Sequence, residues 1–270
     1  MSLLLEPDAY ASAHSLFEAL TYHLAVVTVL AGKLPGRVYV DDPARPRTAI
    51  LIPSNRHRIY VSGEPEPSLL ADVMHLLAKA SPEEGYGFVV YYDTSHPWKP
   101  ALEQAFQRQG IVFSWRQFYR LREPSSPAAS PLPEQVTIGH IDEAMFADTT
   151  LVNRELLLEE IHSESPSLAY FFQQHFGFCA QDGHQLVAWC LAEYHYQGRY
   201  ELGIETIEAY RRQGIATHLA DAVIGQAFAQ GATEIGWHCW AANTPSVATA
   251  LKLGFEKALD YAVCYGQYTP

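Results

Sequence analysis

Twelve residues near the middle of the chain, Glu123–Glu134, contain four prolines and three serines. Because proline lacks a backbone N–H and has a restricted φ, such a run cannot form a helix or a central strand. We expect an extended linker here, dividing the 270-residue chain into two domains of ordinary size. The predicted boundaries are 1–122 for the first domain, 123–134 for the linker and 135–270 for the second domain.

Hydrophobic periodicity predicts a similar order of elements in the two halves. The first half reads as helix 7–30, strands 36–40, 48–53 and 58–62, helix 67–79, strand 87–92, helix 100–109 and strand 111–121. The second half reads as strand 136–140, helix 142–160, strands 176–181, 185–194 and 200–207, helix 217–230, strand 234–240, helix 246–253 and strand 258–268. This order predicts an α/β (α+β) fold of two similar domains, each with a mixed central sheet flanked by helices.

The turn Arg211–Thr217 joins an expected strand to an expected helix and suits an anionic group. Unpaired N–H groups and the positive end of the dipole meet at a helix start. Gly214 and Ala216 leave the backbone open to a ligand. The second half has 6 Lys+Arg against 16 Asp+Glu, and Arg211 and Arg212 are two of those six. The turn therefore predicts a phosphate site, with an ordinary exposed glycine turn as the alternative.

Charge and cysteine usage narrow the class of protein. A net charge of −12 argues against nucleic acid as a partner. No stretch approaches the ~20 apolar residues that span a bilayer, and the first residues do not resemble a secretion signal. The cysteines stand singly, without metal-ligand spacing. We therefore expect reduced core cysteines in a cytoplasmic protein that holds no metal. A catalytic cysteine is the less favoured alternative. The cysteines are Cys179, Cys190, Cys239 and Cys264.

Three motifs in order connect the second half to a known family. Arg211-x-x-Gly214-x-Ala216 follows the expected strand 200–207, Asn243 precedes Ser246 by three residues, and Lys252-Leu253-Gly254-Phe255 follows the expected helix 246–253. Together they resemble the GCN5-related N-acetyltransferase (GNAT) superfamily, which has the acyl-CoA N-acyltransferase fold. The layout is similar to the subgroup with a degenerate domain before the catalytic one. In the first half, the corresponding turn 62–67 carries two carboxylates and two prolines and no arginine, so we expect the cofactor site in the second half.

The resemblance implies that acetyl-CoA lies in a splayed gap between the strands 200–207 and 234–240. The pantetheine arm would pair with the backbone between Ile204 and Thr206 and bond to Asn243, close to Ser246. An asparagine before Thr-Pro is also a common turn residue, and that alternative stays open. The pyrophosphate would lie on the loop made of Arg211, Arg212, Gln213, Gly214, Ile215, Ala216 and Thr217.

The resemblance also implies direct attack of a neutral amine on the thioester, which requires a base. Glu205, beside the expected gap, is the first candidate for that base. Glu201 is the candidate to bind the substrate ammonium, because it lies four residues earlier on the same strand face. Glu193 is a third candidate carboxylate. His238 is a further candidate base, although a hydrogen-bonded lining residue is the more common role of such a histidine.

The residue expected to protonate the leaving thiolate is missing from its usual position. Many family members have a tyrosine on the last helix, and here the alignment of motifs places Ala250 there. Tyr265 or Tyr261, near the C-terminus, could substitute for it, or solvent could supply the proton. The same departure allows a chain that binds CoA with little catalysis.

The sequence therefore predicts an acetyl-CoA-dependent N-acetyltransferase acting on a small-molecule amine. The alternatives are a CoA-binding module and a protein-lysine acetyltransferase. We expect neither a nucleic-acid nor a membrane partner. Whether the chain is a monomer or a homodimer stays open.

Overall fold

The computed structural model describes residues 3–54, 57–79, 86–107, 110–124 and 131–268. Two compact units make up the chain: Met1–Arg116 with Tyr261–Pro270, and Gln117–Asp260. We call them the first unit and the second unit. In the described residues, no helix combines the length and the hydropathy needed to cross a membrane.

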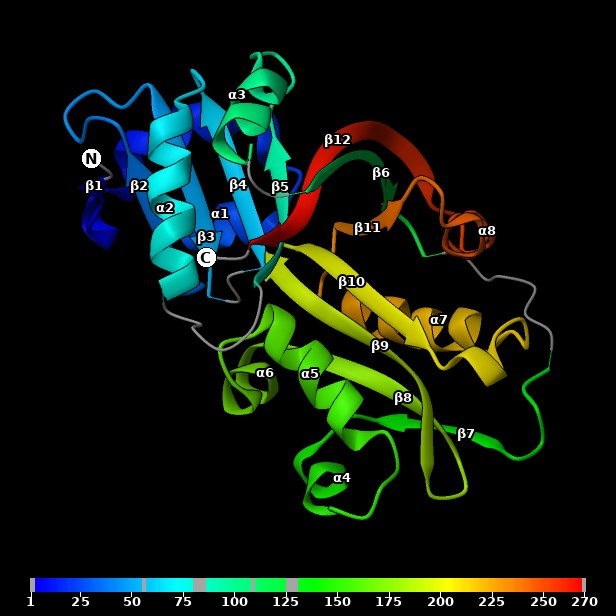
Figure 1. Ribbon diagram of the computed structural model, residues 1–270. Coiled ribbons are helices and arrows are strands. Elements are labelled where there is room, and N and C mark those ends of the chain that lie inside the picture. The colour runs from blue at the N-terminus through cyan, green and yellow to red at the C-terminus, as the bar shows by residue number, and fades with distance from the viewer. Residues whose placement is uncertain (1–2, 55–56, 80–85, 108–109, 125–130, 269–270) are drawn as a thin grey trace. The chain divides into compact units, whose positions relative to one another are not determined.

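The first unit is a mixed sheet with helices on both faces (Figure 1). Its strands follow the order β1-β2-β3-β4-β5-β12, antiparallel except for the parallel pair β4–β5. Buried side chains of α2 and α3 pack on one face of this sheet, and η1 and α1 contact β3 and β4. The strands are β1 Leu3–Leu4, β2 Gly36–Val40, β3 Thr48–Pro53, β4 Arg58–Gly63, β5 Tyr86–Tyr92 and β12 Glu256–Tyr268; the helices are the 3-10 helix η1 Pro7–Leu20, α1 Leu24–Leu30, α2 Pro67–Lys79 and α3 Trp98–Ala105. Strand β6, Ile111–Leu121, begins in this unit and ends in the second unit.

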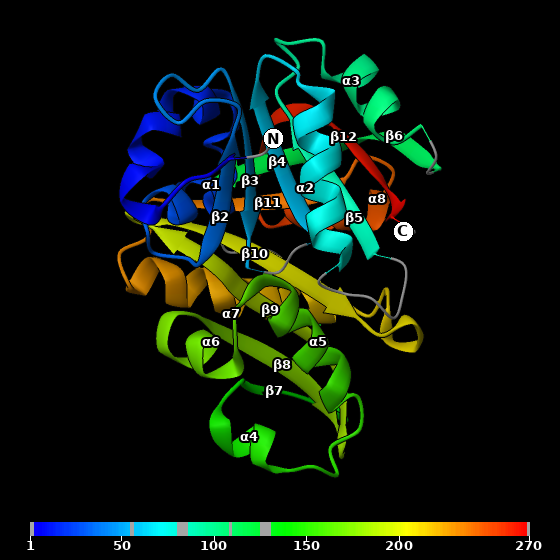
Figure 2. The same ribbon diagram turned by 60° about the vertical axis from the view of Figure 1, so that its left-hand side comes forward.

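The second unit repeats this plan with strands in the order β6-β11-β10-β9-β8-β7. Helix α7 covers one face, while α5 and α6 cover the other, as Figure 2 also shows. Only β10–β11 is a parallel pair among the pairings described for this unit. The strands are β7 Val136–His140, β8 Phe176–Asp182, β9 Gln185–Tyr196, β10 Arg199–Thr206 and β11 Glu234–Trp240; the helices are α4 Glu143–Ala147, α5 Arg154–Glu164, α6 Leu168–Gln174, the 3-10 helix η2 Glu208–Tyr210, α7 Ile215–Ala229 and α8 Thr244–Lys252.

Strands β10 and β11 separate along their length. Their parallel pairing runs from Arg199↔Glu234 to Leu202↔Trp237. Beyond that point β10 continues to Thr206, still paired with β9 but no longer with β11 in the described register. The backbone edge of β10 after Leu202 is therefore not paired with β11 in the described register, at the place where the family resemblance implies a gap.

The borders of the two units differ from the predicted domain borders of 1–122 and 135–270. The division falls inside β6, and the last residues of β12 belong to the first unit. The reason is strand pairing: Val263 in β12 pairs with Tyr91 in β5, while the end of β6 neighbours β11. Part of the predicted linker, 125–130, lies outside the described residues, and its described part contains neither helix nor strand.

Candidate active site

The loop before α7 has the backbone conformation of an anion site. Arg212 has φ 63° and Gly214 has φ 81°, both in the left-handed region. Gly214 is the N-cap residue of α7 and supplies no side-chain hydrogen bond to the helix start. Left-handed residues before a helix turn successive N–H groups toward a common side, where a phosphate oxygen is stabilised. Arg212 adopts this conformation at a cost of about 1 kcal/mol, because its Cβ crowds the backbone.

The loop opens into a cavity of about 760 Å³ at the open ends of β10 and β11. All the predicted cofactor residues line it except Gln213, whose Nε2 donates to the carbonyl oxygen of Ala209 at 3.2 Å. The lining residues are Ile204, Glu205, Thr206, Glu208, Tyr210, Arg211, Arg212, Gly214, Ile215, Ala216, Thr217, Trp237, Asn243, Pro245, Ser246, Thr249 and Lys252.

These residues fit acetyl-CoA. The loop N–H groups and three cationic side chains, Arg211, Arg212 and Lys252, suit the pyrophosphate. The unpaired edge of β10 offers backbone groups to the pantetheine amides, as an added strand would. Lys252 was not among the predicted ligands, although its three-residue spacing from Thr249 on α8 places both on one helix face.

Arg211 is held against the end of β10. Its Nε donates to the carbonyl oxygen of Thr206 at 3.0 Å, and its Nη2 lies 3.2 Å from a carboxylate oxygen of Glu205. Both side chains of this ion pair are about half exposed, at 57% and 49%. Glu205, the first candidate for the base, thus lies beside the glycine loop and is paired with Arg211.

Asn243 and Ser246 organise the start of α8. The Oδ1 of Asn243 accepts from the Ser246 N–H at 3.2 Å, which makes Asn243 the cap of the helix. The Ser246 hydroxyl accepts from Trp237 Nε1 at 3.0 Å. Both residues line the cavity while serving these structural roles.

Glu201 meets His238 at the closed end of the gap. The Oε1 of Glu201 lies 3.4 Å from Nε2 of His238, and the two side chains are only 7% and 9% exposed. The ring of Phe118 stacks on His238 at 4.6 Å between centroids. Glu201 lies one residue before Leu202, where pairing with β11 ends. A buried carboxylate beside an imidazole can hold and release a proton.

Two more buried carboxylates lie on the same side of β9 and β10. Glu193 lies directly over Gly203, since a Cβ built on Gly203 would fall 1.5 Å from Oε1 of Glu193. Glu164, at the end of α5, accepts a hydrogen bond from the Tyr194 hydroxyl. Tyr194 is the register partner of Glu201 and so shares its face. Three buried carboxylates therefore lie on this face of the second unit and give it a negative potential.

Neither C-terminal tyrosine lines this cavity. Tyr265 pairs with Val89 of β5 in the first unit, and Tyr261 is buried there beside Tyr91. Burial raises the pKa of Tyr261 well above its ordinary value. Ala250, at the position where the family resemblance implies a tyrosine, is completely buried in α8.

Tyr210 is the tyrosine that does line the cavity. Its hydroxyl donates to Oδ2 of Asp182 at 2.8 Å, and this hydrogen bond raises the pKa of the phenol. The bond ties η2, which follows β10, to the end of β8. The sequence carried no signal for this contact, because 28 residues separate its two partners.

No group of three or more His, Cys, Asp or Glu side chains in the described residues is placed to hold a metal ion. The described cysteines are all buried.

Comparison with known proteins identifies the family. The sequence model of the GNAT acetyltransferase family matches residues 14–264. The chain belongs to this family. The match runs through both halves, and it confirms the predicted resemblance. The chain is therefore an N-acetyltransferase, an acyltransferase of a family that uses acetyl-CoA.

A relative along the whole length is the uncharacterized N-acetyltransferase YdfB of Bacillus subtilis (strain 168). It is 25% identical over 261 residues, which cover 95% of each chain.

Solved structures share the fold. A GCN5-related N-acetyltransferase-like protein from Streptococcus suis 89/1591 superposes with a TM-score of 0.71 and 20% identity, covering 96% of this chain and 98% of that one. A GCN5-related N-acetyltransferase from Sphaerobacter thermophilus gives 0.63 and 14%, covering 100% and 96%. A tandem GNAT protein from the clavulanic acid biosynthesis pathway gives 0.57 and 12%, covering 100% and 99%. The predicted α/β fold class is confirmed.

Proposed function

We propose that this enzyme transfers the acetyl group of acetyl-CoA to the primary amine of a small molecule. The observation that carries the proposal is the buried pair of Glu201 and His238 at the point where β10 and β11 stop pairing. Acetyl-CoA supplies, as a thioester, the acetyl carbon that the amine nitrogen attacks directly, with the C–N bond forming as the C–S bond breaks.

The chain's own residues hold the donor and handle the proton. The loop N–H groups with Arg212 and Lys252 bind the pyrophosphate, and Glu205 keeps Arg211 against the end of β10. The ammonium form of the acceptor must lose a proton before its lone pair can attack. Glu201, oriented by His238, accepts that proton. We assign the base to Glu201 rather than Glu205 because Glu201 is buried at the closed end of the gap.

The acidic face selects the acceptor. Glu193 and Glu164 add negative charge beside Glu201 and attract an ammonium group. Because these carboxylates are almost wholly buried, the acceptor must be narrow enough to reach them, which favours a small amine over the surface of a folded protein. A solvent proton completes the leaving thiol, since Ala250 offers no acid.

A screen of amines with detection of released CoA thiol tests the proposal. The panel contains polyamines, amino acids, aminoglycosides, arylamines and lysine peptides, each with acetyl-CoA and the full chain. We expect turnover with at least one small amine and none with lysine peptides. Turnover with peptides alone would contradict the small-molecule assignment.

A second function has one observation in its favour. The buried Ala250 fits a protein that binds acyl-CoA without catalysis. Under that alternative, acetyl-CoA raises the melting temperature, and none of the amines gives thiol release above the rate without enzyme. Saturable turnover with any amine excludes it.

A further inference from the structure

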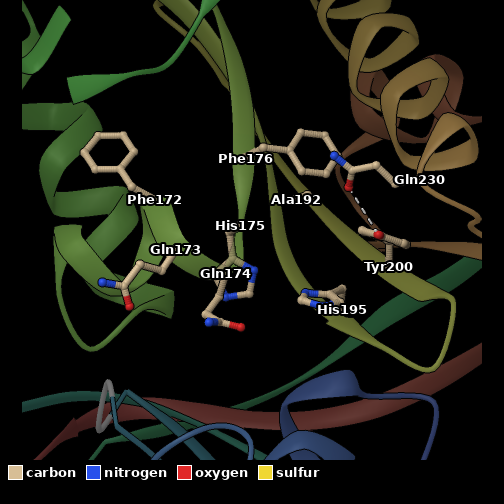
Figure 3. A pocket seen from close by; sticks show the side chains of 9 residues that line it. All are labelled: Phe172, Gln173, Gln174, His175, Phe176, Ala192, His195, Tyr200 and Gln230. Carbon is tan, nitrogen blue, oxygen red and sulfur yellow. Dashed lines mark hydrogen bonds between the residues drawn. The ribbon is translucent and has the colours of Figure 1, made fainter. Parts of the chain in front are cut away.

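A second cavity of about 380 Å³ lies in the second unit, and it shares no lining residue with the acetyl-CoA cavity. It contains Tyr200 at the start of β10, whereas the acetyl-CoA cavity begins at Ile204. At ~3.3 Å per strand residue these positions are roughly 13 Å apart. The lining residues come from α6, three strands and the end of α7 (Figure 3): Phe172, Gln173, Gln174, His175, Phe176, Ala192, His195, Tyr200 and Gln230.

His175 is the unusual member of this set. Both of its ring nitrogens are buried, and neither has a hydrogen-bond partner among the described residues. Buried polar atoms in proteins are nearly always hydrogen-bonded, so two such atoms on one ring point to a partner that is not part of the chain. Figure 3 shows the ring at the centre of the cavity, between α6 and the strand that carries His195.

The walls around His175 are aromatic and amide-rich. His195 lies 5.8 Å from His175 between ring centroids, at 80°, and stacks on Tyr200 at 5.5 Å. Phe176 packs edge-on against Tyr200 at 6.2 Å. The Tyr200 hydroxyl donates to the amide oxygen of Gln230 at 3.4 Å (Figure 3). Rings of this kind stack on flat ligands, and glutamine amides offer both donors and acceptors.

The charge of the ligand follows from the lining. Burial and the neighbouring His195 lower the pKa of His175 to about 4. Protonating it to hold an anion at pH 7 would therefore cost about three pH units, or roughly a thousandfold in affinity. An organic cation would find no Asp or Glu among the lining residues. A metal ion would find two imidazoles, without the third ligand that a protein site needs. An uncharged ligand is the one that the lining favours.

We propose that this cavity binds an uncharged, planar heteroaromatic molecule that carries both hydrogen-bond donors and acceptors. A neutral imidazole has one N–H donor and one acceptor nitrogen, so a ligand with both kinds of group can pair with whichever ring nitrogen of His175 faces it. Its ring stacks against the aromatic walls. The volume lies in the range of small-molecule sites. The site is separate from acetyl transfer and does not depend on the proposed acceptor.

A titration with probes that share one ring tests the charge and the site together. The full chain, with 15N-labelled histidine, is titrated at pH 7 with nicotinamide (uncharged), nicotinate (anionic) and 1-methylnicotinamide (cationic). Uracil and hypoxanthine serve as further uncharged probes of different size. We expect at least one uncharged probe to shift the His175 ring nitrogens saturably, with a Kd of about 1 mM or tighter. The charged analogues should bind at least about tenfold more weakly. Nicotinate would require protonation of His175, and 1-methylnicotinamide would find no carboxylate in the lining.

Three results would overturn the proposal: no saturable shift with any uncharged probe, tighter binding of nicotinate than of nicotinamide, or a response to Zn²⁺ alone. His175→Phe keeps a ring of similar size and removes both nitrogens. We expect this variant to bind the probe at least about tenfold more weakly. Its melting temperature at pH 7 should not fall, because no hydrogen bond within the protein is lost. The matched control, His162→Phe on the exposed side of α5, should bind as the wild type does.

A second variant guards against a folding defect in the first. His195 is exposed, so His195→Ala removes an aromatic wall without opening the core. We expect His195→Ala to lower the affinity for the probe severalfold while the protein stays folded. Unchanged binding in both His175→Phe and His195→Ala would place the probe elsewhere and refute the site.

Discussion

Glu201 and His238 are diagonal neighbours on two parallel strands, with Oε1 and Nε2 3.4 Å apart. The direct register partner of Glu201 is Gly236, two residues before His238. A Cβ on Gly236 would lie 3.2 Å from Cγ of Glu201, so the glycine gives the carboxylate room to reach the imidazole. The gap between β10 and β11 opens one residue further on, and the pair therefore borders the open backbone edge.

The first prediction compares two carboxylates on one strand. Glu201→Gln should lower kcat by about 10²- to 10⁴-fold, the usual contribution of a general base, with little change in acetyl-CoA affinity. Glu205→Gln should raise the KM for acetyl-CoA severalfold with kcat nearly retained, because it releases Arg211. Steady-state kinetics between pH 6 and 9, with acetyl-CoA binding by calorimetry, give both values. The reverse pattern would return the role of base to Glu205.

The second prediction concerns the loop backbone. Gly214 has φ 81°, where a β-branched side chain is strained by about 1–2 kcal/mol. Gly214→Val should therefore shift the loop away from this conformation and reduce acetyl-CoA affinity more than tenfold, while the far-ultraviolet circular dichroism of the protein is unchanged. Gly183→Val, which places the same change at φ 56° in the β8–β9 turn, is the control for backbone strain alone. Equal affinity of both variants would remove the loop from the site.

Much of the fold was predictable because it depends on local pattern. The strands at 36–40, 48–53, 111–121, 136–140 and 234–240 have the predicted bounds. The segment 7–30 was predicted as one helix, and the structure divides it into η1 and α1 where His23 turns extended. Periodicity does not report such a break, nor does it distinguish a 3-10 helix from an α-helix. Strand β6 ends in the second unit and strand β12 ends in the first unit. This arrangement depends on pairing between strands far apart in the sequence, which local hydrophobic periodicity does not predict.

The glycine turn before α7 was predictable and the polar contacts around it were not. The loop is a contiguous motif, and its glycine carries the signal. The ion pair of Glu205 with Arg211 and the approach of His238 to Glu201 depend on where each side chain lies in three dimensions. Along the sequence, Glu205 lies nearer the expected gap than Glu201 does, whereas in the structure Glu201 is buried and Glu205 is half exposed. The burial of a side chain depends on the tertiary structure and has no local signal in the sequence.

The third prediction tests the position of Glu193. A Cβ at Gly203 would fall on its carboxylate, so Gly203→Ala should displace that carboxylate, with little effect on the fold because only the end of a side chain must move. We expect the KM for the amine to rise severalfold with unchanged acetyl-CoA affinity. In a Glu193→Gln background the Gly203→Ala substitution should have a much smaller effect, since the effects of mutations at contacting residues are not additive. Additive effects in this double-mutant cycle would show that Gly203 acts independently of Glu193.

The fourth prediction concerns thiol reactivity. Burial raises the pKa of Cys179 to about 11 and that of Cys264 to about 12, and that of Cys190 further still. The thiolate is the reactive form, so these cysteines should resist labelling by a disulfide reagent at pH 7.5 in the folded protein and react on denaturation. Stoichiometric fast labelling of the native protein would contradict this. The same inertness gives a low background in the CoA-release assay.

The last prediction is a pH dependence of stability from His175. Its pKa is about 4 in the folded protein against an ordinary 6.5, so the neutral ring is favoured by folding. Between these values the unfolded chain binds more protons than the folded one, and stability falls as the pH falls from 6.5 toward 4. The loss of unfolding free energy contributed by this group approaches roughly 3 kcal/mol at the acid end and vanishes above pH 7.

His175→Phe removes the group and should be destabilised less by acid than the wild type. Melting temperatures measured from pH 7.5 to 4.5 should therefore diverge, the variant gaining roughly 6–10 °C on the wild type at the lowest pH. The exposed His162→Phe control should follow the wild type throughout. Parallel curves for the wild type and His175→Phe would mean that the ring is protonated as easily in the folded chain as in the unfolded one.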